Sequence, residues 1–114
     1  MDIDFEDEKL KKMCLNGKEA QKKLGADGAK KLSTRLHELD AADNVTELVA
    51  GNPHPLENKG KQKNRLGQYS VGLVGGKRLI FKPNQKPAPK NEHDDIDWSM
   101  VTSIVIIEIG DYHD

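Results

Sequence analysis

The sequence is poor in the residues that mark secreted, redox-active and membrane-spanning proteins. Its 114 residues include one cysteine, Cys14, which excludes an intrachain disulfide and a thiolate metal cluster and favours a buried structural thiol over a nucleophile. No stretch approaches the roughly 18 consecutive apolar residues of a membrane span. Residues 1–9 are acidic where a secretory signal would be basic and then apolar. We therefore expect a cytoplasmic protein, and the length predicts a single domain over residues 1–114.

Charge is unevenly distributed along the chain, although the formal net charge is only −1. Residues 51–91 hold nine Lys or Arg and one acid, Glu57, a local charge of +8, whereas residues 92–114 hold seven acids and no Lys or Arg. So basic a segment favours contact with a polyanion through its phosphate groups. Solubilising lysines on exposed strands are the alternative, and composition alone leaves both interpretations open.

Apolar spacing predicts helices in the first half of the chain. A short strand around residues 3–5 is followed by a helix that ends at residues 16–17. A further helical turn is expected at 18–24, and the main helix begins after Asp27, which has the side chain of an N-cap. Arg35 and several lysines are expected on its solvent side. The apolar stripe on the opposite side consists of Ala29, Leu32, Leu36 and Leu39.

The second half of the chain has the pattern of strands. Residues 69–74 and 77–82 flank Gly75-Gly76, whose tolerance of positive φ predicts a tight hairpin. Residues 101–109 are apolar and mostly β-branched, as in a strand covered on both faces near the centre of a sheet. The fold class is therefore α+β, with N-terminal helices packed on a mostly antiparallel sheet of about four strands.

Residues 83–97 interrupt this pattern, since they are rich first in proline and then in acids. They predict a mobile insertion between two strands. The acids at 92–97 also raise the question of a metal site, because oxygen-rich clusters bind divalent ions, but their spacing matches no defined calcium loop. We expect neither a metal site nor a cofactor.

The last predicted strand leads into three side chains that can transfer protons or form hydrogen bonds, namely Asp111, Tyr112 and His113. If the last strand continues past Gly110, Asp111 and His113 share one face and Tyr112 lies on the other. A frayed tail is the alternative interpretation. A function for these residues therefore depends on support from elsewhere in the chain.

Several short motifs supply that support when they are taken together. They are the helix at 32–42, His54-Pro55-Leu56 at the start of the sheet, a basic loop ending at Arg65, Arg78 in the hairpin, and the terminal Asp111-Tyr112-His113. In order and spacing this set resembles the HigB-like toxins of the RelE/ParE superfamily, the plasmid maintenance killer type, for which the insertion at 83–97 is atypical. The resemblance implies a RelE-like fold and a ribosome-dependent mRNA endoribonuclease of a type II toxin-antitoxin system. It also implies a helix-turn-helix, HigA-like antitoxin and the 70S ribosome as partners, no membrane, and oligomers formed through the antitoxin.

The resemblance also assigns roles that the chemistry permits. Cleaving RNA without a metal requires removal of a 2′-hydroxyl proton, stabilisation of charge on the phosphorus and protonation of the departing 5′ oxygen. His54 and His113 are the candidate acid and base, with their individual roles open, and Arg78 is the candidate for charge stabilisation. Asp111 would orient an imidazole or act as the base, and Tyr112 would stack on a base or hydrogen-bond a phosphate. Contacts to the RNA backbone or to ribosomal RNA would come from Lys59, Lys61, Lys63, Arg65 and Lys77.

Two other functions stay open at this point. A non-enzymatic, ParE-like toxin that poisons gyrase would not be expected to bring His54 and His113 together. The other is a catalytically inactive toxin-fold protein with an interaction or regulatory role. A pure interaction module or antitoxin-like regulator would usually show a helix-turn-helix pattern or a disordered arm, and neither is evident. The endoribonuclease is therefore the leading hypothesis.

Overall fold

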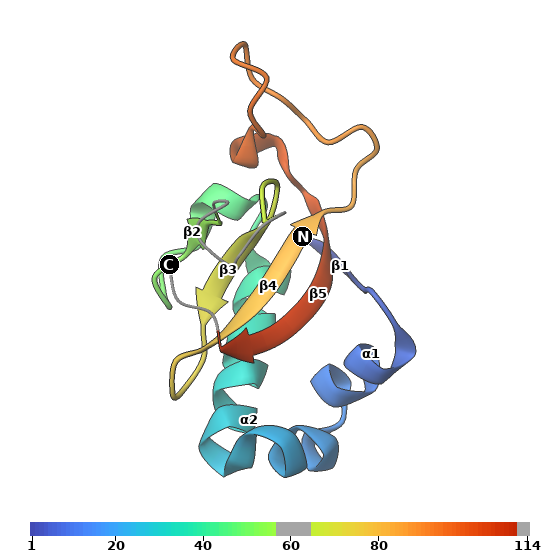
Figure 1. Ribbon diagram of the computed structural model, residues 1–114, viewed down its shortest axis with the longest axis vertical. Helices are drawn as coiled ribbons and strands as arrows, with labels where there is room; N and C mark the ends of the chain where they lie inside the picture. The colour runs from blue at the N-terminus through green and yellow to red at the C-terminus, as the bar shows by residue number, and fades with distance from the viewer. Residues whose placement is uncertain (57–64, 112–114) are drawn as a thin grey trace.

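The computed structural model describes residues 1–56 and 65–111, and every structural statement below concerns these ranges. Helices and strands form two layers, with the helices on one face of a single sheet (Figure 1). The elements follow in the order β1 (Asp2–Phe5), α1 (Glu8–Leu15), α2 (Gly17–Ala41), η1 (Val45–Glu47), β2 (His54–Pro55), β3 (Tyr69–Gly72), β4 (Lys77–Pro83), η2 (Trp98–Met100) and β5 (Ser103–Asp111). None of the described helices is long and apolar enough to span a membrane.

The sheet has five strands in the order β1-β5-β4-β3-β2, so the prediction of about four was wrong by one. The β1 strand pairs parallel to β5, and every other neighbouring pair is antiparallel. The additional strand is β2, an edge strand of two residues, which is too short to show an alternating pattern in the sequence. The other edge strand, β1, corresponds to the short strand expected around residues 3–5. The α+β class and the mostly antiparallel sheet are confirmed.

The predicted hairpin is also confirmed, between β3 and β4. Gly75 and Gly76 at its turn have φ of +65° and +80°, values that other residues rarely adopt. The β5 strand lies between β1 and β4, as expected of a central strand, but its two faces are buried to different extents. Ile104 and Ile106 are fully buried on the helix side, whereas Val105 and Ile107 on the other side are only partly buried.

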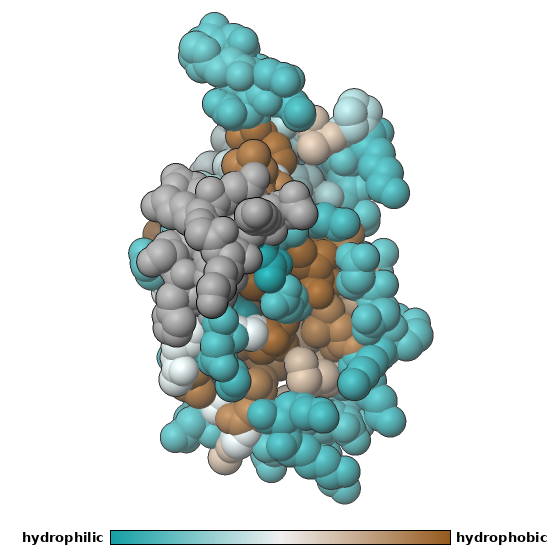
Figure 2. Space-filling view, viewed as in Figure 1, coloured by the Kyte–Doolittle hydropathy of each residue, from teal (hydrophilic) through white to brown (hydrophobic). Residues whose placement is uncertain are grey.

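Strand alternation separates an inner face, which packs on the helices, from an outer face. The inner face carries Tyr69, Val71, Leu79 and Phe81, which form the main core with Leu32 and Leu39 of α2. Cross-strand partners share a face, so the register assigns the outer face to His54, Ser70, Arg78, Ile80 and Glu108. Ile80 is fully buried there in a small second cluster with Leu56. Figure 2, seen from this side, shows apolar side chains gathered over β4 and β5 with hydrophilic ones around them.

The long helix α2 is interrupted at Gly25, which has non-helical φ and ψ of 75° and 173°. The predicted division into a short helix and a main helix is therefore confirmed, but the break lies at Gly25 and not at the Asp27 cap. Asp27 itself is helical. A positive φ at this position is accessible to glycine at little cost, so Gly25 takes the bend.

The prediction for Arg35 was wrong, because its side chain is buried and not on the solvent side of α2. The residue is 9% exposed; its Nε donates to the carbonyl of Gly72 at 2.8 Å, and its Nη1 lies 2.8 Å from Glu38 Oε1. The helical spacing does indicate that Arg35 lies on the apolar face, since it follows Leu32 by three residues and precedes Leu39 by four. The helix thereby reaches the backbone of β3 through a charged side chain.

Arg35 meets β3 at a junction between two glycines. The amide of Gly72 donates to the carbonyl of Gly51 at 2.7 Å. Gly51 has φ of +81°, and a Cβ placed on it would lie 2.7 Å from Arg35 Nε. A Cβ on Gly72 would lie 3.2 Å from the Gly51 carbonyl oxygen. We call this contact the glycine junction; it ties the segment before β2 to β3 and to α2.

The predicted insertion between β4 and β5 is anchored at its ends. An isolated bridge joins Lys90 and Ile96, and Ile96 and Trp98 pack against the main core. The Trp98 ring lies 4.8 Å from that of Tyr69, centroid to centroid, and burial raises the pKa of the Tyr69 hydroxyl. The mobility expected for residues 83–97 stays a prediction.

Replacing Arg35 by methionine tests the glycine junction. We expect Arg35→Met to lower the free energy of unfolding by about 2–3 kcal/mol, because the partly buried Gly72 carbonyl loses a charged donor. Urea denaturation followed by circular dichroism measures this. Lys30→Met, an exposed position on the same helix, is the matched control and should change stability by less than about 0.5 kcal/mol. Equal effects of the two substitutions would contradict the role given to Arg35.

Candidate functional site

Half of the ten predicted site residues can be located. His54, Arg65, Lys77, Arg78 and Asp111 belong to the described residues. The other five lie outside them, and their roles remain predictions: Lys59, Lys61, Lys63, Tyr112 and His113.

Arg78 is held on the outer face by a cradle of oxygen atoms. Its Nε donates to Ser70 Oγ at 2.7 Å, and its Nη2 donates to the carbonyl of Asn52 at 2.7 Å. Two longer contacts of Nη2, each 3.3 Å, reach the carbonyls of Gly51 and Ser70. Ser70 is fully buried, so its hydroxyl is a fixed acceptor. Arg78 therefore depends on β3 and on the glycine junction for its position.

His54 lies beside Arg78, as the sequence analysis anticipated. The two residues are brought together by register, since His54 pairs with Ser70 and Ser70 pairs with Ile80, two residues along β4 from Arg78. His54 Nδ1 lies 2.8 Å from the Asn52 carbonyl and 3.4 Å from Arg78 Nη2. A carbonyl oxygen only accepts, so this geometry assigns the proton to Nδ1 and the lone pair of the neutral ring to Nε2. That tautomer suits His54 to accept a proton at Nε2.

Arg65 extends the outer face along β5. Its Nη2 lies 2.8 Å from Glu108 Oε1, and its Nη1 donates to Gln68 Oε1 at 3.0 Å. Glu108 pairs with Ile80 across the strands and so shares the face of Arg78. The outer face therefore carries a carboxylate that the sequence analysis did not single out.

Asp111 is placed differently from the other predicted catalytic residues. Its Oδ1 lies 3.5 Å from Lys77 Nζ, its cross-strand partner. Lys77 and Asp111 alternate with Arg78 and Gly110, so the register assigns them to the opposite face of the sheet. The structure brings His54 and Arg78 together, and it pairs Asp111 with Lys77 instead.

The charge segregation of the sequence is partly cancelled in three dimensions. Basic residues of the 51–91 segment form ion pairs with acids from elsewhere in the chain, namely Arg65 with Glu108, Lys77 with Asp111, Lys82 with Glu6 and Lys90 with Asp94. Except for Arg65, these are exposed pairs of 3.5–3.8 Å, which contribute little to stability. An incoming phosphate can replace such carboxylates at small cost.

Three residues important to the arrangement were missed from sequence. Strand alternation assigns Ser70 to the face opposite Tyr69 and Val71, so the sequence alone carries no signal that its hydroxyl is buried. Gly51 and Asn52 have positive φ values of 81° and 49°, and their carbonyls accept hydrogen bonds from Arg78. Their role depends on contacts distant in sequence.

The other two described histidines have local partners. His37 Nδ1 lies 2.7 Å from the carbonyl of Ser33 within α2. His93 is exposed and lies 3.5 Å from Glu92. Within residues 1–56 and 65–111, no three His, Cys, Asp or Glu side chains converge in a way that could hold a metal ion.

Comparison with known proteins gives a fold relationship. No family model matches the sequence. No curated protein sequence matches it either. Among solved structures, the chain is similar to a YoeB/ParE toxin from Agrobacterium tumefaciens, with a TM-score of 0.57, 12% identity, and coverage of 99% of this chain and 100% of that one. The α+β architecture is therefore that of a YoeB/ParE toxin.

Cys14 lies away from this site, in α1, and its environment fits the predicted structural role. Burial raises the pKa of its thiol to about 11. At pH 8 this lowers the thiolate fraction by about 100-fold relative to an ordinary thiol with a pKa of 9.0. We expect iodoacetamide to alkylate the folded protein at pH 8 about 100-fold more slowly than the urea-unfolded chain, as measured by mass spectrometry. Equal rates would contradict the burial of the thiol.

Proposed function

We propose that this protein is a ribosome-dependent mRNA endoribonuclease, the toxin of a type II toxin-antitoxin system, and that it cleaves by metal-free acid/base chemistry. The observation that carries the proposal is the placement of His54 beside Arg78 on the outer face, in a chain with the fold of a YoeB/ParE toxin. A cognate helix-turn-helix antitoxin, HigA-like, would hold it inactive. The ribosome would present the message to the outer face.

The proposed reaction uses the geometry of Arg78 and His54. The 2′-hydroxyl oxygen attacks the adjacent phosphorus and the bond to the 5′ oxygen breaks, leaving a cyclic phosphate and a 5′-hydroxyl. His54 Nε2 accepts the 2′-hydroxyl proton, because Nδ1 is engaged with Asn52. The Arg78 guanidinium, already oriented by its oxygen cradle, stabilises the charge that develops on the phosphate oxygens. Preorganisation of this kind lowers the barrier because little reorientation accompanies the reaction.

The other predicted residues enter the proposal as follows. His113 would protonate the departing 5′ oxygen, and Tyr112 would stack on a base. Asp111, with Lys77, would act at the margin of the site and not at the phosphate. The RNA backbone would be bound by Lys59, Lys61, Lys63 and Arg65, with Glu108 releasing Arg65 when a phosphate arrives.

A non-enzymatic, ParE-like toxin is the second candidate, since the structural neighbour carries both names, YoeB and ParE. Poisoning of gyrase would need no proton acceptor beside Arg78. Gyrase-mediated DNA breaks, without cleavage of message, would favour this candidate over the endoribonuclease.

Alanine at His54 tests the proposed base. We expect His54→Ala to lower the rate of message cleavage on translating ribosomes by about 10²–10⁴, because a general base is lost. Primer extension on ribosome-bound message measures it. His37→Ala is the matched control and should cleave as the wild type does. Wild-type cleavage by His54→Ala would refute the assignment.

Alanine at Ser70 tests whether the buried hydroxyl positions Arg78. We expect Ser70→Ala to lower kcat by about tenfold with little change in KM, since one hydrogen bond to the guanidinium is lost. The Arg78→Lys variant has no guanidinium, so it lacks the Nε that donates to Ser70 Oγ. In that background Ser70→Ala should lower kcat almost no further. Additive losses in this double-mutant cycle would instead indicate that Ser70 acts independently of Arg78.

A further inference from the structure

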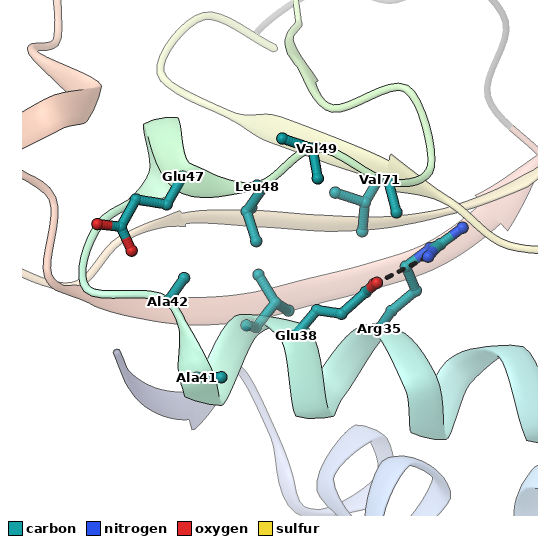
Figure 3. Close-up of a pocket in the computed structure, with 10 residues that line it drawn as sticks. Arg35, Glu38, Ala41, Ala42, Glu47, Leu48, Val49 and Val71 are labelled. Carbon is teal, nitrogen blue, oxygen red and sulfur yellow. Dashed lines mark hydrogen bonds and ion pairs between the residues drawn. The ribbon is translucent and has the colours of Figure 1, made fainter.

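An ion pair between an arginine and a glutamate lies on the outer face, where helix packing does not account for it. Two ion pairs of the described residues join their atoms at 2.8 Å. In one, Arg35 and Glu38 lie three residues apart on α2, and the buried arginine also binds the backbone of β3, so this pair belongs to the packing of the helix on the sheet (Figure 3). In the other, Arg65 and Glu108 have side chains that are 21% and 43% exposed. A ligand can therefore reach the second pair from solvent.

Gly110 lies between the Glu108 carboxylate and Arg78. It is the cross-strand partner of Arg78 and follows Glu108 by two residues, so all three belong to the outer face. A Cβ built on Gly110 would lie 3.2 Å from Glu108 Oε2, so this carboxylate oxygen lies close to the glycine backbone. Arg78 extends toward β3, where Ser70 Oγ accepts from its Nε. The backbone of Gly110 is therefore bordered by a carboxylate along β5 and by an arginine on β4.

The local structure does not require a glycine at position 110. Its φ lies outside the left-handed region, and the three described atoms nearest to a Cβ there all belong to Glu108, at 3.2–4.0 Å. The irregularity in the pairing of β4 with β5 lies at Ile80 and Phe81 and not at Gly110. A glycine inside a strand weakens the strand, and it often marks a place where a ligand approaches the backbone closely. Close approach of a ligand therefore explains Gly110 better than the fold does.

The chemistry of Glu108 selects the part of an RNA that fits beside Arg78. An ionised carboxylate only accepts hydrogen bonds, and it repels a phosphate, so it favours the edge of a base that carries N–H donors. Guanine presents two adjacent donors on its Watson–Crick edge, N1–H and N2–H. Adenine and cytosine place an acceptor nitrogen beside their amino group, and uracil places its N3–H between two carbonyl oxygens. Guanine is thus the base whose donors match the two oxygen atoms of one carboxylate.

We propose that Glu108 and the backbone of Gly110 form a subsite for a guanine base next to the scissile phosphate, in which the carboxylate accepts from guanine N1–H and N2–H. Arg65 orients the carboxylate in the unbound protein. When Arg65 turns to the RNA backbone, it leaves both carboxylate oxygens to the base. The position of this guanine beside the cleaved bond rests on the proposed function, whereas the preference of the subsite for guanine does not.

Three trinucleotides that differ only in the middle base, UGU, UAU and UIU, test the subsite without ribosomes. Inosine (I) lacks the N2 amino group of guanine. In nuclear magnetic resonance titrations of the labelled full chain, UGU should shift the Gly110 amide signal and bind about tenfold more tightly than UAU or UIU, because they lack one of the two matched hydrogen bonds. No shift at Gly110, or equal affinities for UGU and UIU, overturns the proposal.

Glutamine at position 108 tests the carboxylate itself. Glu108→Gln should lower the affinity for UGU by about tenfold and remove the difference between UGU and UIU, since an amide offers one acceptor and one donor. The matched control is Glu6→Gln, because Glu6 also pairs with a cation of the basic segment and its side chain is 50% exposed, against 43% for Glu108. Glu6→Gln should discriminate between the trinucleotides as the wild type does. Equal behaviour of the two variants contradicts the role of Glu108.

Alanine at position 110 tests whether the glycine serves the ligand or the fold. We expect Gly110→Ala to leave the midpoint of thermal unfolding unchanged or higher, because its φ is accessible to alanine. The affinity for UGU should fall by about fivefold or more, since the methyl group occupies the space beside the carboxylate. A lower midpoint together with unchanged affinity for UGU would show that the glycine serves the fold alone and would overturn the subsite.

Messages with each of the four bases on either side of the cleavage site test the link to the reaction. By primer extension on translating ribosomes, the wild type should cleave about tenfold faster beside guanine, and Glu108→Gln should slow that cleavage until the preference is gone. If no message is cleaved while UGU is still preferred in binding, the proposed function fails and the subsite stands. If messages are cleaved without regard to guanine, the proposed function stands and the subsite does not lie beside the scissile phosphate.

Discussion

The glycine junction is the contact on which the candidate site depends. Two arginines approach it from opposite faces of the sheet, Arg35 from α2 and Arg78 from β4, and both bind its backbone carbonyls. Gly51 and Gly72 permit this because side chains there would collide with Arg35 and with the Gly51 carbonyl. The buried Arg35 guanidinium and the partly buried Gly72 carbonyl satisfy one another, and either group would be costly to bury without its partner. Helix packing and the orientation of the outer-face arginine thus share one hydrogen-bond network.

Ion pairs reduce the effective positive charge of the basic segment, residues 51–91. Its charge of +8 in sequence is reduced by ion pairs with carboxylates of Glu6, which follows β1, of β5 and of the 83–97 insertion. The pairs are mostly exposed and weak, so the cations stay accessible to phosphate in exchange for a carboxylate. Arg78 is positioned differently, because the Ser70 hydroxyl and the Asn52 carbonyl accept hydrogen bonds from its guanidinium. These neutral oxygen atoms orient the guanidinium at the proposed position of the scissile phosphate.

Much of the fold was accessible from sequence because its signals are local. The Gly75-Gly76 turn, the β-branched last strand and the stripe of Leu32 and Leu39 each depend on neighbours a few residues away. The short β2 strand, the burial of Arg35 and the placement of Asp111 opposite Lys77 depend on contacts between segments distant in sequence. The same holds for the site: His54 and Arg78 were identified by type and motif, whereas Ser70 and the Asn52 carbonyl became visible only once the strands were aligned.

The central claim is that Arg78 and His54 drive attack by a ribose 2′-hydroxyl on its own phosphate. The most direct measurement is the chemical identity of the ends left on a message cut on translating ribosomes. The account predicts 5′-hydroxyl ends, resistant to ligation until a kinase adds phosphate, and 2′,3′-cyclic phosphates on the other fragment. Fragments with 5′-phosphate ends would contradict it, because they require water or another external nucleophile in place of the 2′-hydroxyl.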